Sequence, residues 1–258
     1  MKLSTVDIQT KEVTQWQGLH LLHYSMSSCS QKVRILMGEL GIDFTSHHVD
    51  LRSNEQKSDW FTGINPNGVV PVLVHDGEVH IESNDIIGYL NNTFAQDASA
   101  LMPKTAAEQE KMQALLSLED EMHNDLRTVT FTYLAPAIHG PLAPDPEFSY
   151  IGRFHAALDQ LSKILGDQLF LMGDHLSLAD ISWFITLHRL ALARYPLAAH
   201  RLVPYYERLA ARPAFAEQVI SGPIPLRAAS AIYRTINRAF LKSLPRDYVA
   251  WSNQQRTA

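Results

Sequence analysis

Apolar residues over the first hundred positions switch between the spacing of strands and that of helices. Residues 19–24 form a short apolar run typical of a buried strand, and residues 44–49 are expected to form a second strand. Between them, apolar side chains recur at helical spacing over residues 30–40, and Gly41 follows as a stop signal for a helix. The pattern therefore predicts a strand, a helix and a second strand in that order.

The following segment predicts a short helix, a hairpin and a longer helix. We expect the short helix at residues 54–61. Two expected strands, at 72–74 and 78–81, flank the sequence His-Asp-Gly, which is typical of a tight hairpin turn. Ser83 then precedes a stretch whose apolar residues have helical periodicity. Together with the first unit, this gives the order βαβαββα, which is a small α/β domain.

Beyond the polar, Ala-rich stretch 95–105, the pattern is helical. The segments "APAIHGPLAPDPEF" and "SGPIP" interrupt it. We expect helices at residues 105–134, 147–166, 177–195, 201–211 and 226–244. The chain is thus expected to have four parts, which are an N-terminal extension (1–17), the α/β domain (18–95), an all-α domain (105–225), and an extra C-terminal helix with a tail (226–258).

The composition of the 258 residues is that of an ordinary globular protein, with 46% hydrophobic and 19% charged residues. A net charge of −5 gives no indication of a nucleic-acid partner. No apolar run reaches the roughly 18 residues that a membrane span requires, and the first residues lack the apolar core of a leader peptide. The single cysteine cannot form an internal disulfide, which fits a reducing compartment. We therefore expect a cytoplasmic protein with no nucleic-acid partner and no integral membrane segment.

The twelve histidines raise the question of a metal site. None of them lies in an H-E-x-x-H motif or in a Cys/His cluster. The sequence therefore gives no reason to expect a metal.

Three short motifs lie at the ends of the expected elements of the α/β domain, and they are Ser27-Ser28-Cys29-Ser30, Val70-Pro71 and Glu82-Ser83. In this order they resemble the cytosolic glutathione S-transferase superfamily, whose members have a thioredoxin-like N-terminal domain and an α-helical C-terminal domain. The segment "YSMSSCSQKVRI" is similar to the active-site loop of the zeta class, which includes maleylacetoacetate isomerase, and of the tetrachlorohydroquinone reductive dehalogenases. "NPNGVVPVL" and "ESNDIIGYL" resemble the family's glutathione-site segments.

The resemblance extends into the helical part and covers residues 19 to 220. There "SLADI" resembles the family's helix-capping motif, with Ser177 and Asp180 as a capping box and Leu176 and Ile181 as a hydrophobic staple. We interpret this motif as a folding element without a chemical role.

The resemblance implies glutathione as co-substrate and assigns its binding residues. Val70 is expected to pair its backbone with the cysteinyl part of glutathione, because the family holds the bond to the following proline, Pro71, in the cis form. Ser83 begins a helix, and its hydroxyl and the first N–H groups would bind the γ-glutamyl carboxylate. Glu82 would provide the counter-charge for the γ-glutamyl ammonium. Ser83 alone could equally be an ordinary helix cap.

The catalytic hydroxyl is expected in the loop before the first helix. Ser27 matches the catalytic serine of the zeta class, and a serine hydroxyl can donate to the glutathione thiolate. Ser28 and Cys29 are the neighbouring candidates, whereas Ser30 is expected to be an ordinary helix residue. Tyr24 is the rival, because tyrosine-type transferases place their donor at the end of this strand.

Cys29 allows two interpretations. It is either a small, half-buried residue in the first helical turn or a thiol whose pKa is lowered by the helix N-terminus. The dehalogenases use a cysteine at this position to form a mixed disulfide with glutathione. No second cysteine is present, which argues against dithiol exchange of the thioredoxin type.

Residues of the long helix expected at 105–134 would line the pocket for the second substrate, or else belong to the core or the surface. The candidates are Met122, His123, Leu126 and Thr130. Near the C-terminus, residues 227–242 have apolar residues on one side and basic residues on the other. This segment is either an amphipathic helix at a membrane surface or an extra helix packed over the body or the pocket mouth.

These observations favour a homodimeric glutathione transferase that adds the thiolate to a small hydrophobic or aromatic electrophile, without a metal. The alternatives within glutathione chemistry are reductive dehalogenation, β-ether cleavage or cis–trans isomerisation at the same site, with Cys29 taking part. A further alternative is an interaction module of the same fold without catalysis.

Overall fold

The computed structural model describes residues 1–96, 101–134, 147–220 and 244–257. The chain forms two compact units, residues 1–100 and residues 101–258. Each unit has its own buried apolar core.

The N-terminal unit is built on a four-stranded mixed sheet with the strand order β2-β1-β3-β4. The strands are β1 (Leu19–His23), β2 (Thr45–His48), β3 (Val72–His75) and β4 (Glu78–His80). β1 runs parallel to β2, whereas β1 with β3 and β3 with β4 are antiparallel pairs. This topology confirms the predicted order of strands and the thioredoxin-like fold of the domain.

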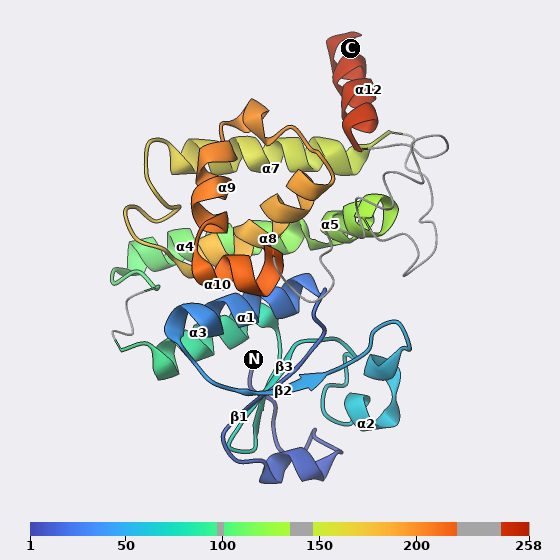
Figure 1. Cartoon of the computed structure of the whole chain (residues 1–258), viewed down its shortest axis with the longest axis vertical. Helices are drawn as coiled ribbons and strands as arrows, with labels where there is room; N and C mark the ends of the chain where they lie inside the picture. Colours follow the sequence, from blue (N-terminus) through green and yellow to red (C-terminus); the bar gives the residue numbers. More distant parts are fainter. Residues whose placement is uncertain (97–100, 135–146, 221–243, 258) are drawn as a thin grey trace. The chain divides into compact units, whose positions relative to one another are not determined.

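Helices α1 (Ser28–Leu40) and α3 (Ser83–Phe94) pack together beside the strands (Figure 1). α1 ends at Gly41, whose φ of 64° lies in the left-handed region that glycine adopts without steric cost. The short helix expected at residues 54–61 consists of a 3₁₀ turn, η2 (Glu55–Lys57), followed by α2 (Asp59–Thr62).

Residues 1–17 pack against the sheet. Leu3 donates its N–H to the carbonyl of Val79 at 2.8 Å, which adds a bridge to the outer edge of β4. Ile8 and Val13 are fully buried in the core of this unit, and Val13 belongs to the 3₁₀ helix η1 (Lys11–Gln15). The segment that lies outside the family resemblance is therefore an integral part of the N-terminal unit.

The second unit is helical over its described residues. Its elements are α4 (Ala106–Glu121), α5 (His123–Val129), the π-helical turn η3 (Thr130–Leu134), α7 (Ser149–Leu165), α8 (Leu178–Leu192), η4 (Leu197–His200), α9 (Val203–Ala210), α10 (Pro213–Phe215), the π-helical turn η5 (Ala216–Ile220) and α12 (Leu244–Thr257). α8 is the central helix, because its residues 178–190 are all buried. The indole N–H of Trp183 on α8 donates to the carbonyl of Leu115 on α4 at 3.0 Å.

The capping box at the start of α8 is present. The Asp180 carboxylate accepts hydrogen bonds from the backbone N–H and the hydroxyl of Ser177, at 2.8 and 2.6 Å. It also accepts from the N–H of Leu171 and the hydroxyl of Tyr205. Burial raises the pKa of Asp180, and these hydrogen bonds oppose the shift. This buried network joins α8 to α9 and to the preceding loop, which agrees with a role in folding.

Three details of the helical unit differ from the sequence-based expectation. The single helix expected at 105–134 is divided at Met122, whose N–H bonds both to Leu118 and to Glu119, and it ends in a π-helical turn. The elements α10 and η5 were not expected. The C-terminal region contains a helix, α12, where we expect a tail. The helix expected at 226–244 and the segment 227–242 lie outside the described residues, except for Leu244.

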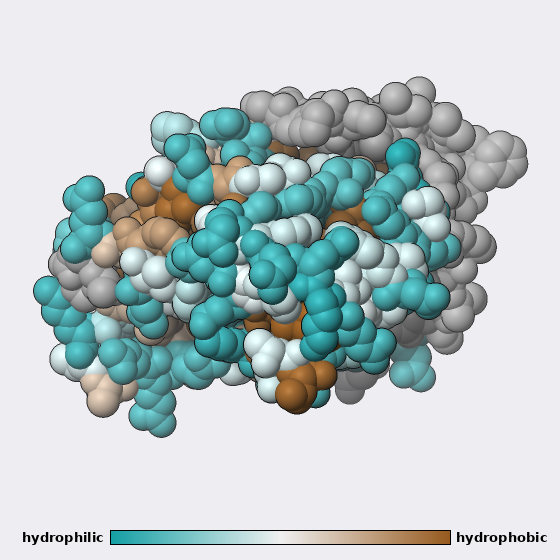
Figure 2. All heavy atoms as spheres, turned by 90° about the horizontal axis from the view of Figure 1, so that it is seen from below, coloured by the Kyte–Doolittle hydropathy of each residue, from teal (hydrophilic) through white to brown (hydrophobic). Residues whose placement is uncertain are grey.

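The face in Figure 2 is mostly hydrophilic, with small and separate apolar areas. Across the described residues, the large exposed apolar side chains are those of Met1, Val6, Trp60, Val69, Leu169 and Val249. Such scattered residues are normal on a protein surface. None of the described helices is both long enough and apolar enough to cross a membrane.

Candidate active site

Ser27 lies at the junction between β1 and α1, where it is the N-cap residue of the helix. Its backbone is extended, with φ −68° and ψ 127°, and its Oγ accepts a hydrogen bond from the N–H of Ser30 at 3.3 Å. The N–H of Ser27 donates to the carbonyl of Tyr24 at 3.1 Å, which closes the loop. A hydroxyl has one donor proton and two acceptor lone pairs, so the capping bond leaves the proton of Ser27 available to donate to a ligand.

The other residues of the serine-rich loop have different environments. Ser28 and Cys29 are half-buried in the first turn of α1. Ser30 is fully buried, and its Oγ accepts a hydrogen bond from the N–H of Tyr24 at 3.4 Å. Ser30 therefore ties the helix to the end of β1, and Ser27, Ser28 and Cys29 are the more accessible candidates.

Tyr24, the rival donor, is buried at the end of β1. Its hydroxyl lies 4.0 Å from the sulfur of Met26, and its ring is tilted against that of His48. Burial raises the pKa of Tyr24, and the nearby Arg52 opposes this shift. The phenol is thus held in its neutral form with its hydroxyl directed at a thioether.

Arg34 on α1 supports the serine-rich loop through its guanidinium, a role that the sequence analysis did not predict. Its Nη2 donates to the carbonyl of Ser25 at 3.0 Å, and its Nη1 lies 3.1 Å from Nδ1 of His23. Burial lowers the pKa of Arg34 to about 10. Burial and the adjacent Arg34 lower the pKa of His23 to about 4, so the imidazole is neutral at neutral pH and its Nδ1 can accept from Arg34. The sequence does carry a signal for this role, because Arg34 is a charged residue among the apolar positions of the expected helix.

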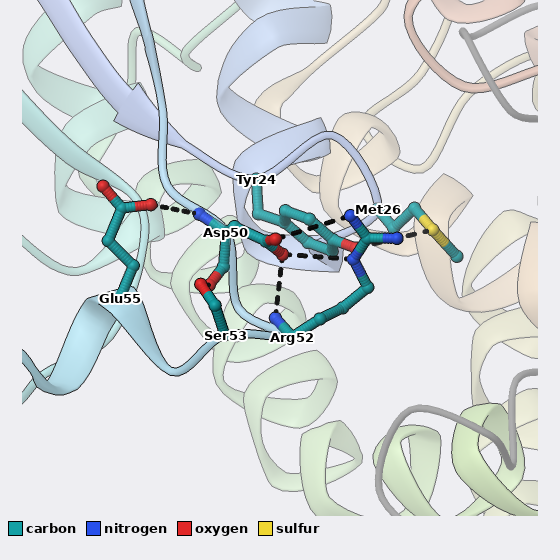
Figure 3. Close-up of polar contacts among 6 residues, drawn as sticks. All are labelled: Tyr24, Met26, Asp50, Arg52, Ser53 and Glu55. Atoms are coloured by element: carbon teal, nitrogen blue, oxygen red, sulfur yellow. Dashed lines mark hydrogen bonds and ion pairs between the residues drawn. The ribbon is translucent and has the colours of Figure 1, made fainter.

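A second cationic group that sequence reasoning missed comes from the loop after β2. Asp50 accepts from both the N–H and the Nε of Arg52, at 2.9 and 3.1 Å, and the N–H of Asp50 donates to Glu55 at 2.7 Å. These bonds to Arg52 lower the pKa of Asp50. Figure 3 shows the guanidinium of Arg52 facing the carboxylate of Asp50, and its charge acts on the pKa of the nearby Tyr24. The loop therefore presents a fixed cation beside the end of β1.

The peptide bond between Val70 and Pro71 is cis. Pairing of β3 with β1 begins at Val72, so Val70 lies outside the ladder of paired residues. The preceding loop is fixed by Asn65, a fully buried residue whose side-chain amide donates to the carbonyl of Val69 at 2.8 Å. The backbone at Val70 is therefore held in place at the end of the sheet.

Glu82 and Ser83 form the N-terminus of α3. Glu82 has a φ of 66°, which is uncommon and unfavourable for a residue with a side chain, and such strain is concentrated at functional sites. Its exposed carboxylate accepts from the side-chain amide of Asn67 at 3.3 Å. Ser83 is buried as the first helical residue.

The register of the sheet brings these three segments to one place. Leu22 pairs with Val72 in the antiparallel ladder, so Tyr24 and Val70 lie at the same end of neighbouring strands. The bond between Asn67 and Glu82 then connects the start of α3 to the loop before β3. The N-terminal unit therefore collects a capped serine hydroxyl, a backbone segment outside the ladder, and a helix N-terminus with a carboxylate.

The four candidates for the second-substrate pocket lie on the helical unit, where three of them are buried. Met122 and Leu126 are buried apolar residues. Thr130 is also buried, and its hydroxyl donates to the carbonyl of Leu126 at 2.7 Å and accepts from Nη1 of Arg189 at 2.9 Å. His123 is the half-exposed member of the four.

Comparison with known proteins gives this architecture a family. Residues 26–93 match the family "Glutathione S-transferase, N-terminal domain", and residues 118–217 match "Glutathione S-transferase, C-terminal domain". Glutathione S-transferase 3 of Zea mays is 31% identical over 212 residues, which span 78% of this chain and 94% of the maize protein. The chain therefore belongs to the glutathione S-transferase family, and it is an enzyme of that family.

Two further relatives bear on the subclass. Glutathione S-transferase TCHQD of Arabidopsis thaliana is 26% identical over 233 residues, which span 76% of this chain and 88% of the relative. Protein LigF of Sphingobium sp. (strain NBRC 103272 / SYK-6) is 36% identical over 103 residues, which are 40% of each chain. The crystal structure of LigF, described as a beta-etherase, superposes with a TM-score of 0.67 at 25% identity and covers 80% of this chain and 100% of LigF.

Proposed function

We propose that the N-terminal unit binds glutathione, stabilises its thiol as the thiolate through the Ser27 hydroxyl, and adds it to a small hydrophobic or aromatic electrophile. The observation that carries this proposal is the geometry of Ser27. Its lone pair caps α1 while its proton remains free to donate at the same helix N-terminus. In this position the hydroxyl and the helix dipole act on one sulfur.

The free energy needed to lower the pKa of the glutathione thiol supports a serine hydroxyl in addition to the helix dipole. A free thiol with a pKa of about 8.5 is only about 3% ionised at pH 7, and lowering the pKa by about 2 units takes about 2.7 kcal/mol. A helix N-terminus gives about 0.3–1 kcal/mol, whereas a hydrogen bond to a charged acceptor gives about 1.5–3 kcal/mol. The dipole of α1 alone is too weak, and the dipole together with Ser27 is sufficient.

Thiolate formation accounts for only part of the expected rate. Such a shift raises the thiolate fraction about 25-fold, but a Brønsted slope of about 0.45 lowers the nucleophilicity about eightfold. The net gain is about threefold, so most of the acceleration has to come from positioning the electrophile beside the sulfur. We assign that task to the helical unit and keep Met122, His123, Leu126 and Thr130 as the residues to test.

Three groups of the N-terminal unit would hold the tripeptide. The backbone of Val70 lies outside the β ladder and can pair with the cysteinyl residue as an added strand segment. The first N–H groups of α3 and the Ser83 hydroxyl can bind the γ-glutamyl carboxylate. Glu82 is exposed at the same point and can bind the γ-glutamyl ammonium. We further propose that the enzyme works as a cytoplasmic homodimer and needs no metal for this reaction.

A second reaction at the same site is favoured by the similarity to LigF, described as a beta-etherase. In glutathione-dependent ether cleavage, the thiolate attacks the carbon that carries the ether oxygen. A C–S bond forms as the C–O bond breaks, and the aryloxide leaves with the electron pair. The demands on Ser27 are the same in both reactions, so only the substrate distinguishes them.

The proposal is tested with glutathione as the thiol. Free cysteine is the control thiol, because it lacks the γ-glutamyl group and the peptide bonds that the protein is proposed to bind. We expect retention on immobilised glutathione and saturable conjugation of 1-chloro-2,4-dinitrobenzene with glutathione but not with cysteine. A β-aryl ether that releases a coloured aryloxide tests the second reaction. Absence of both retention and turnover would contradict the proposal and favour an interaction module.

A further inference from the structure

Two histidines and an aspartate meet on the helical unit. His155 and Asp159 are one turn apart on α7, and His200 ends the 3₁₀ helix η4. Nδ1 of His200 lies 2.7 Å from Oδ1 of Asp159, and Nε2 of His155 lies 3.5 Å from Oδ2. One potential ligand atom of each residue lies within 4.8 Å of the other two. Two imidazoles and a carboxylate are a donor set that transition-metal ions bind.

The His155 ring is directed at this carboxylate without completing a hydrogen bond. The 3.5 Å separation exceeds the usual 2.7–3.2 Å of such bonds. Nδ1 of His155 is buried and has no hydrogen-bond partner among the described residues. Packing holds the ring instead, because it lies tilted against Trp251 with the ring centres 5.0 Å apart. A metal ion between His155 and Asp159 would use an interaction that the protein alone leaves incomplete.

His200 is positioned from both sides. Its Nδ1 faces Asp159, and its Nε2 lies 3.0 Å from the hydroxyl of the buried Tyr195. If Nδ1 binds a metal, its proton has to move to Nε2, where the Tyr195 hydroxyl becomes the acceptor. Such an outer partner fixes the orientation of a ligating imidazole.

A tetrahedral ion at this cluster requires the side chains to move. Zinc bonds of about 2.0–2.1 Å place neighbouring ligand atoms about 3.3 Å apart. Nε2 of His155 lies 3.5 Å from Oδ2 of Asp159, close to this spacing, whereas Nδ1 of His200 lies 2.7 Å from Oδ1, about 0.6 Å below it. The two distances end on different oxygens, so the carboxylate has to rotate to bring one oxygen to both nitrogens, and the chosen ligand atoms of the three residues lie within 4.8 Å of one another. The Asp159 side chain is 47% exposed, so it is the member that can move.

We propose that His155, Asp159 and His200 bind a divalent transition-metal ion, with Zn²⁺ as the reference ion and water at the fourth position. This site is separate from the residues that we assign to glutathione. The ion links α7 to the turn before α9 and stabilises the folded helical unit by mass action. No short sequence motif indicates this site, because Asp159 and His200 are separated by 41 positions in the chain.

The test is calorimetric titration of ZnCl₂ into untagged, chelator-treated full-length protein. We expect one saturable site, and a higher melting temperature in the presence of Zn²⁺. The variants His155→Ala and Asp159→Asn alter partly exposed side chains and should bind at least about tenfold more weakly. The matched controls His175→Ala, at an exposed histidine, and Cys29→Ala should bind as the wild type does.

A second measurement locates the ion. Cu²⁺ prefers the same donors and quenches nearby indoles, so it should quench the wild-type protein more than the variant Trp251→Phe. Absence of saturable Zn²⁺ binding would overturn the proposal. Wild-type affinity in both His155→Ala and Asp159→Asn would overturn it as well, because the ion would then be held elsewhere.

Discussion

Ser27 accepts a hydrogen bond from the backbone N–H of Ser30 at 3.3 Å, so the residue proposed to bind the thiolate also caps α1. These two roles use different parts of the hydroxyl. The lone pair serves the helix, and the proton serves the ligand. A variant can therefore keep one role and lose the other.

The first prediction separates these roles at Ser27. Ser27→Ala should lose about 1 kcal/mol of stability as a cap, and the pH profile of kcat/KM for conjugation should move up by about 1–2 pH units. Ser27→Asp retains an acceptor for the cap but has no donor proton above its own pKa. We expect it to restore stability and not activity, as measured by urea unfolding and pH–rate profiles. A shift seen only in Tyr24→Phe would instead identify Tyr24 as the donor.

The second prediction concerns Cys29, which is half-buried in the first turn of α1. Cys29→Ala should leave simple conjugation unchanged, because the attacking sulfur belongs to glutathione. Any glutathione-dependent reductive dehalogenation should be lost, because that reaction uses a mixed disulfide with the protein thiol. Turnover of a halogenated hydroquinone checks this, and retention of the reductive activity by the variant would exclude the thiol role.

The third prediction concerns the support of the loop by Arg34. Arg34→Met retains an unbranched apolar stem but leaves the carbonyl of Ser25 without the donor at 3.0 Å. We expect a loss of about 1–3 kcal/mol in urea unfolding and a lower kcat/KM, because the position of Ser27 depends on this loop. Glu39→Gln, at the far end of the same helix, is the comparison variant, and equal effects of the two changes would contradict the role of Arg34.

The fourth prediction is a pH dependence of stability that arises from His80. Burial lowers the pKa of His80 from 6.5 to about 4. Between these values the unfolded chain binds a proton that the folded chain does not. The stabilising contribution is therefore complete above pH 6.5 and is lost as the pH falls toward 4.

The variant His80→Phe tests this pH dependence. The His80 ring stacks on Tyr89 with ring centres 3.9 Å apart, and its Nε2 is buried without a hydrogen-bond partner in the described part of the chain. Phenylalanine retains the stacking and removes the titrating group. We expect the slope of unfolding free energy between pH 6.5 and 4 to fall by about 1.4 kcal/mol per pH unit. An unchanged slope would show that His80 does not titrate in this range.

The fifth prediction concerns the attachment of α12. The hydroxyl of Tyr133 donates to the buried carboxylate of Asp247 and lies 2.5 Å from the hydroxyl of Tyr150. Burial and these hydrogen bonds raise the pKa of Tyr133. Removing a hydrogen bond to a charged group costs about 1.5–3 kcal/mol. Tyr133→Phe should therefore accelerate amide exchange in residues 244–257, whereas Val249→Ala, at a residue that is 56% exposed, should not.

Much of the N-terminal unit could be read from local patterns. The first helix was expected to end at Gly41, and the hairpin turn was expected at residues 75–77, because glycine and turn residues act on the nearest backbone. The motif residues Val70 and Glu82 could also be identified from the sequence. The structure then places Val70 at the end of the sheet and gives Glu82 a positive φ. Both are properties of the assembled unit.

The chain by itself determined the order of the strands and helices between residues 19 and 94, the presence of an α/β part followed by a helical part, and the family, because periodicity, caps and short motifs are local properties. Only the tertiary structure decided the partners of Arg34 and the meeting of Asp159 with His200. The helix α12 was also visible only in the structure, because its sequence is polar. Its buried Asp247 accepts a hydrogen bond from Tyr133, a residue 114 positions earlier in the chain. Hydrogen bonds between distant residues depend on packing, and no local pattern encodes them.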